Sequence, residues 1–150
     1  MSVDLMPSPA ALVPFIATSA FDAELERFLD LLDAHQLFTV ESRSSQRQSV
    51  IYAQQLVAAL RRRAYEVVKE KQTASRWPVV EVSFETWAWD NGDFWYESGA
   101  TLRHFDGTVS RDVDLSFDDV SGPLTDLAGV DRPFAGDTLT VDLRTGEVST

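Results

Sequence analysis

Hydrophobic residues recur with a helical period in the first part of the chain. From about residue 20 to residue 35 the apolar positions form one stripe of a helix, and acidic residues occupy part of the opposite face. Ser19 and Asp22 have the spacing of a capping box, which predicts that this helix begins near Ser19. The residues of the stripe are Phe21, Leu25, Phe28, Leu29 and Leu32.

A second, longer helix is predicted from Ser45 to about Lys71. Ser45 and Gln48 form another capping-box pattern at its start. These boundaries place His35 at the C-terminal end of the first helix, where a cation interacts favourably with the helix dipole. The apolar stripe of the second helix comprises Ala53, Val57, Leu60, Ala64 and either Val67 or Val68.

After Trp77 and Pro78 the hydrophobic period changes from about 3.6 to about 2 residues, and β-branched and aromatic residues dominate. This change predicts a sheet. Residues 116–136 are rich in Gly, Pro and Asp, and they predict mostly irregular structure with one helical turn near residues 124–127. Strands are expected at residues 79–89, 94–105, 108–115 and 138–143, with a final turn at residues 144–147.

Together these elements predict an α+β fold of two layers, with two N-terminal helices packed on one face of an antiparallel sheet of four or more strands. We expect a single domain over residues 19–150, preceded by a proline-rich extended arm over residues 1–18. In outline, this order of elements resembles that of small bacterial immunity proteins and of NTF2-like domains, in which helices precede a curved sheet.

The turn at residues 90–93 decides which side chains share a face of the sheet. A two-residue Asn91-Gly92 turn would give a poor core, whereas a three-residue turn with Gly92 left-handed pairs Val82 with Ala100 and Ala88 with Phe94. The second pattern collects the apolar side chains, together with His104, on one inner face. The expected inner face is Val80, Val82, Phe84, Phe94, Tyr96, Leu102, Val109, Val113 and Leu115.

The same register places Trp87 opposite Trp95, and Glu85 opposite Glu97, on the outer face. Opposed like charges and clustered exposed Trp side chains both cost stability, so this face is a candidate binding surface. In one alternative the Trp side chains are covered by the arm or by residues 116–136, and in another the two Glu residues form a glycosidase-like pair. The candidate binding residues are Trp87, Trp89, Trp95, Glu85, Glu97, Asp112 and Asp114.

Composition and charge narrow the functional classes. The chain has 150 residues and no cysteine, which excludes disulfide scaffolds and thiol nucleophiles. Its start lacks a signal-peptide pattern, so we expect a cytoplasmic protein without a membrane partner. The net charge of −11 disfavours general binding to nucleic acid or anionic membranes. Residues 43–76 are the exception, with eight basic and two acidic residues.

No motif in the chain is typical of a particular catalysed reaction. There is no phosphate loop, dinucleotide fingerprint or EF-hand spacing, so we expect no cofactor, no metal site and no catalytic residue. The consecutive residues Arg61, Arg62 and Arg63 are expected to pair with acidic neighbours such as Glu66 rather than with nucleic acid. His104 is expected to be a hydrogen-bonded core histidine.

The leading hypothesis is a non-catalytic acidic protein-binding module, an inhibitor or immunity-type bacterial protein that covers a cationic surface of a basic partner such as a toxin or an enzyme. The alternative is a small enzyme or ligand-binding domain of the NTF2-like type, with a pocket between helices and sheet that uses His104, Tyr96 and Arg103. A polar pocket that reaches His104 would favour the alternative, and a filled core beside an open Trp and Glu face would favour the inhibitor.

Overall fold

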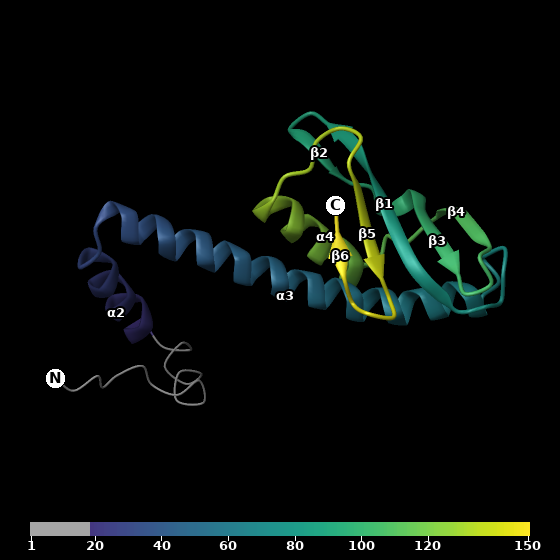
Figure 1. Ribbon diagram of the computed structural model, residues 1–150, viewed down its shortest axis with the longest axis horizontal. Helices are drawn as coiled ribbons and strands as arrows, with labels where there is room; N and C mark the ends of the chain where they lie inside the picture. Colours follow the sequence, from purple (N-terminus) through teal and green to yellow (C-terminus); the bar gives the residue numbers. More distant parts are fainter. Residues whose placement is uncertain (1–18) are drawn as a thin grey trace. The chain divides into compact units, whose positions relative to one another are not determined.

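The computed structural model describes residues 19–150, so the predicted proline-rich arm lies outside the described residues. The first two helices are α2 (Ser19–Asp30) and α3 (Ala34–Lys69) (Figure 1). The chain divides into two compact units, one that ends at Ser44 and one that begins at Ser45. The sheet and the candidate sites described below belong to the second unit.

Helix α3 begins at Ala34 because a capping box directly precedes it. The backbone N–H of Asp33 donates to Oε1 of Gln36 at 3.0 Å, and the backbone N–H of Gln36 donates to Oδ1 of Asp33 at 2.8 Å. The two residues thus satisfy backbone donors that have no partner within the helix.

Two predictions about this helix are wrong as a result. The pair Ser45 and Gln48 lies inside α3, where the backbone donors already bond to carbonyls one turn earlier, so it caps nothing. His35 lies in the first turn of α3 instead of at the end of α2. A cation at this end of a helix meets the positive end of the dipole, so the predicted favourable interaction is absent.

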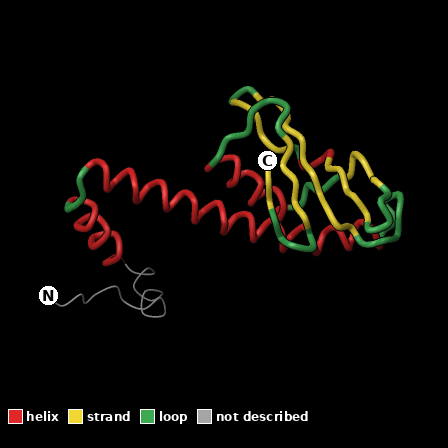
Figure 2. The backbone as a smooth tube through the Cα atoms, viewed as in Figure 1, coloured by secondary structure: helices red, strands yellow, loops and turns green. Residues whose placement is uncertain are grey.

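The sheet is antiparallel, with six strands in the order β4-β3-β1-β5-β6 and with β2 paired to β1. Figure 2 shows its strands in yellow beside the red helices. This confirms the α+β class and the antiparallel sheet. The predicted strand over residues 79–89 coincides with β1, whereas the one over residues 94–105 is interrupted by the 3₁₀ helix η1 (Glu97–Gly99). The strands are β1 (Val79–Trp89), β2 (Gly92–Trp95), β3 (Ala100–His104), β4 (Val109–Val113), β5 (Thr138–Asp142) and β6 (Val148–Ser149).

Helix α4 (Asp118–Val130) replaces the irregular structure that was expected over residues 116–136. Its buried residues Val120, Leu124 and Ala128 recur at helical spacing. Burial of this stripe outweighs the low helix propensity of the Gly and Pro residues within it. Within the unit that begins at Ser45, the helical members of the core come from α3 and α4 (Figure 1). The prediction included the second of the N-terminal helices in this core but not α4.

Most of the predicted inner face is buried, but its register differs from the prediction. Val82 lies opposite Leu102 instead of Ala100. Phe94 and Tyr96 are half-buried. The buried members of the predicted face are Val80, Val82, Phe84, Leu102, Val113 and Leu115.

The β1-β2 turn has two residues, Asp90 and Asn91, so Trp89 pairs with Gly92 and Ala88 pairs with Asp93 instead of Phe94. Gly92 has the predicted positive φ, +127°.

A three-residue turn occurs instead at residues 105–107, whose glycine has a φ of +84°. This turn places Val109 opposite Arg103 on the outer face and Ser110 opposite Leu102 in the core. The prediction that Val109 lies on the inner face is therefore wrong, because a shift of one residue moves a side chain to the other side of a strand.

Candidate functional site

Two of the three predicted Trp residues are exposed on the outer face. Trp87 is 55% exposed and Trp89 is 59% exposed. Glu85 is also exposed, and the three residues occupy every second position of β1. Their side chains therefore share one face of the strand. The ring of Tyr96 lies 5.2 Å from the ring of Trp87, in a tilted arrangement. We call Glu85, Trp87 and Trp89 the tryptophan surface.

Trp95 belongs to the core. It lies opposite Thr86, and only 6% of it is exposed. Together with Ala53 of α3 and Leu127 of α4, it lines a cavity of about 310 Å³. The predicted opposition of Trp87 and Trp95 is therefore wrong, because Trp87 faces Phe94 instead. Residues 116–136 do cover a Trp, as one alternative expected, but that Trp is Trp95.

The predicted opposition of Glu85 and Glu97 is also wrong. Glu85 pairs with Thr138 of β5. Glu97 lies in η1, outside the strands, and accepts a hydrogen bond from the hydroxyl of Ser121 at 3.0 Å. The two carboxylates therefore do not face each other as a glycosidase pair would across neighbouring strands.

Asp112 and Asp114 are exposed, but they lie apart from the tryptophan surface. Asp112 is on β4, an edge strand that β3 separates from β1. Asp114 directly follows β4 and accepts hydrogen bonds from the hydroxyl and the backbone N–H of Ser116, which lower the pKa of Asp114. These two carboxylates therefore do not extend the tryptophan surface.

Two other carboxylates of the outer face are paired with arginines. Glu81 accepts two hydrogen bonds from Arg103, at 3.1 and 2.7 Å, and these bonds lower the pKa of Glu81. Asp142 accepts a hydrogen bond from Arg144 at 2.9 Å, and its pKa is also lowered. Glu85, by contrast, forms no ion pair with any residue in the described part of the chain. Glu85 therefore adds an unpaired negative charge beside the Trp residues.

His104 is fully buried, as expected of a core histidine. Its Nδ1 lies 2.7 Å from the carbonyl oxygen of Trp77, and its Nε2 lies 2.9 Å from the hydroxyl of Ser110. A carbonyl only accepts, so Nδ1 donates, and in the neutral ring Nε2 accepts from Ser110. Arg103 precedes His104 on β3 and pairs with Glu81 on the opposite face. The proposed grouping of His104 with Arg103 and Tyr96 therefore does not form.

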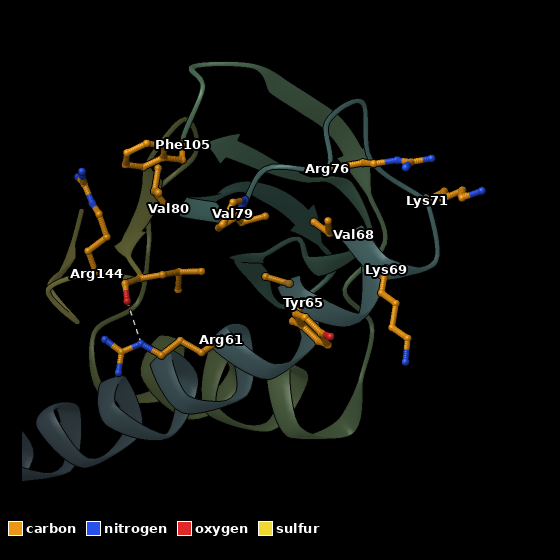
Figure 3. A pocket seen from close by; sticks show the side chains of 13 residues that line it. Arg61, Tyr65, Val68, Lys69, Lys71, Arg76, Val79, Val80, Phe105 and Arg144 are labelled. Carbon is orange, nitrogen blue, oxygen red and sulfur yellow. Dashed lines mark hydrogen bonds between the residues drawn. The ribbon is translucent and has the colours of Figure 1, made fainter.

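A cavity of about 830 Å³ lies between the second half of α3 and the start of β1 (Figure 3). The alternative hypothesis expected a pocket between helices and sheet, but it did not predict the residues that line this one. His104 does not line it. Its walls are apolar and aromatic, and its basic residues come from α3, from the segment after α3 and from the turn that follows β5. The apolar and aromatic lining residues are Ala64, Tyr65, Val68, Pro78, Val79, Val80, Phe105 and Leu143, and the basic ones are Arg61, Lys69, Lys71, Arg76 and Arg144.

The positive segment over residues 43–76 was the sequence signal for this cavity, because it supplies four of the five basic lining residues. The expected internal pairing holds for Arg62 and Arg63, which both bond Asp119. Arg61 instead donates to the carbonyl of Leu143 at 2.8 Å. Of the eight basic residues in this segment, two thus form ion pairs with Asp119 and four line the cavity.

Within residues 19–150, no helix is long and apolar enough to cross a membrane. The same residues contain no group of three or more His, Cys, Asp or Glu side chains that could hold a metal ion. Comparisons of the chain with protein-family models, curated proteins and solved structures found no match.

Proposed function

We propose that the protein is a non-catalytic binding protein whose tryptophan surface covers a cationic surface of another protein, as an inhibitor does. The observation that carries the proposal is the exposure of Trp87 and Trp89 on the same face of β1 as Glu85. Trp is enriched at interface hot spots because its large, rigid ring buries much area at a small cost in conformational entropy. Contiguous exposed apolar groups often mark an interaction site.

Charge indicates the chemistry of the partner. Glu85 and Asp90 are exposed beside the Trp side chains and form no ion pair with a described residue. The whole chain carries a net charge of −11. A field of this sign attracts a basic protein over long range and raises its association rate, and the Trp side chains then hold the complex.

Affinity purification from the cells that produce the protein tests this proposal. The native chain is compared with the double variant Trp87→Ala/Trp89→Ala and with Trp77→Ala. Trp77 is a matched control because it is 54% exposed and packs against a different aromatic residue, Phe105, at 6.0 Å.

The native protein and Trp77→Ala should retain the same basic protein. The double variant should lose it, since removal of hot-spot residues costs about 2 kcal/mol or more in binding. A partner that the double variant retains as strongly as the native protein does would contradict the proposal.

A further inference from the structure

The cavity beside α3 combines an apolar wall with a cationic rim. Figure 3 shows Val68, Val79 and Val80 around its centre, while Lys69 and Arg76 extend outward from its edge. Long basic side chains commonly line apolar surface with their stems and keep their charged heads in water. A molecule seated on the valines would therefore have cationic groups within reach at its end.

The charge of this cavity is opposite to that of the protein. Five of the 13 basic residues line the cavity, whereas no acidic residue in the described part of the chain does. Among the described residues, Lys69, Lys71 and Arg76 have no carboxylate partner. An acidic chain with this arrangement keeps an uncompensated positive charge at one place, and such a place attracts an anion.

The remaining lining residues give the cavity fixed sides. Arg61 is held by its hydrogen bond to the carbonyl of Leu143, and Arg144 is held by Asp142. Tyr65 and Phe105 border the cavity and are 70% and 67% exposed. Both rings would be partly shielded from water by an apolar ligand, which favours binding.

We propose that this cavity binds an amphiphile that has an apolar body and one anionic head group. The body lies against Val68, Val79 and Val80, and the head lies at the rim formed by Lys69, Lys71 and Arg76. The volume of about 830 Å³ is within the range of small-molecule sites, roughly 300–1,000 Å³. A carboxylate and a phosphate share the chemistry that this rim recognises.

Calorimetry with dodecanoate, below the concentration at which it forms micelles, tests the ligand class. Dodecanol has the same chain without the charge, and dodecyltrimethylammonium has the opposite charge. Dodecanoate should bind roughly tenfold more tightly than dodecanol, if each of three exposed charges contributes modestly. Dodecyltrimethylammonium should bind more weakly than either. Equal affinity for dodecanoate and dodecanol would overturn the assignment of the rim.

Two triple variants with the same change in net charge test the residues. Lys69→Gln/Lys71→Gln/Arg76→Gln removes the rim, and Arg43→Gln/Arg47→Gln/Arg111→Gln removes three exposed charges that do not line the cavity. The rim variant should bind dodecanoate roughly tenfold more weakly, and the control should change by less than about twofold. Equal affinities of the two variants would overturn the proposal.

A membrane surface is the competing source of the same head-group chemistry, and vesicles distinguish it. Vesicles of phosphatidylglycerol are compared with vesicles of phosphatidylcholine and with monomeric dodecanoate. Binding of monomeric dodecanoate supports a site for single molecules. Binding to phosphatidylglycerol vesicles without any binding of monomeric dodecanoate would overturn the proposal and indicate a lipid surface instead.

This site is independent of the tryptophan surface. The double variant Trp87→Ala/Trp89→Ala should bind dodecanoate like the native protein, because neither residue lines the cavity. Loss of dodecanoate binding in that variant, with its fold intact by circular dichroism, would contradict the separation of the two sites.

Discussion

Ser110→Ala should loosen the segment between α3 and β1, because this hydroxyl is the centre of a buried hydrogen-bond network. Its oxygen accepts a hydrogen bond from the backbone N–H of Ala74 at 2.9 Å, and it lies 2.9 Å from Nε2 of His104. Nδ1 of His104 donates to the carbonyl of Trp77 at 2.7 Å. One hydroxyl thus ties residues 74–77, which include the rim residue Arg76, to β3 and β4.

The size of the effect follows from burial. Without the hydroxyl, Nε2 of the fully buried His104 has no partner, and a buried polar group without a partner costs about 1–3 kcal/mol. Ala74 is exposed, so water can accept its N–H in the variant. For a chain of this length, each kcal/mol lowers Tm by about 2–4 °C, so Tm should fall by about 2–12 °C.

Urea unfolding of the native protein, Ser110→Ala and Ser83→Ala measures this loss. Ser83 is a matched control because it is half-buried on β1 and its side chain has no hydrogen bond to a described residue. Proton–nitrogen NMR should show the His104 proton on Nδ1. A loss of stability in Ser110→Ala no larger than that in Ser83→Ala, or a His104 proton on Nε2, would contradict the role of this hydroxyl.

Two further predictions concern the core and the paired carboxylates. Trp95→Ala should lower the free energy of unfolding by about 3–5 kcal/mol because it removes a large core side chain. Trp87→Ala should lower it by less, because over half of Trp87 is already exposed. Equal losses of the two variants in chemical denaturation would contradict the register. The hydrogen bonds from Arg103 lower the pKa of Glu81, so this carboxylate adds stability above its ordinary pKa of about 4, and the contribution is lost as the pH falls through the lowered pKa. Glu81→Gln should therefore flatten the dependence of stability on pH in the acid range, and an unchanged dependence in urea unfolding would contradict the role of this ion pair.

Strand β1 could be predicted from the sequence because every second residue in its first half packs into the core. Val80, Val82 and Phe84 alternate with more exposed residues and are buried, so the hydrophobic pattern and the structure agree. Helix α4 could not be predicted in the same way, because Gly122 and Pro123 lie within it and normally interrupt helices. The helical spacing of its buried residues was the competing signal.

The faces of the sheet were harder to predict than its strands. A glycine with positive φ lies at each turn, Gly92 (+127°) directly after the β1-β2 turn and Gly107 (+84°) within the β3-β4 turn, so the local preference of glycine is satisfied whether a turn has two or three residues. A difference of one residue at each turn moved Val109 to the outer face and changed the partner of Trp87 from Trp95 to Phe94. Turn length depends on the packing of side chains from distant parts of the chain, which a single sequence does not reveal.

The basic residues of the cavity could be predicted only in part from the sequence. The positive charge of residues 43–76 was evident, but the pattern favoured internal ion pairs. Arg144 lies far along the chain and joins this segment only because β5 pairs with β1 and ends beside α3. Such a site depends on contacts between distant residues, so charge counting alone cannot find it.

The association rate of the captured partner, measured by stopped flow at several salt concentrations, tests the tryptophan surface most directly. The Debye length is about 10 Å at 0.1 M salt, so an increase from about 0.02 to about 0.5 M should slow association by about tenfold or more, with a much smaller change in dissociation. Glu85→Gln/Asp90→Asn should flatten this dependence, because it removes the unpaired carboxylates beside Trp87 and Trp89. An association rate that does not change with salt, or a double variant that associates like the native protein, would contradict the proposed function.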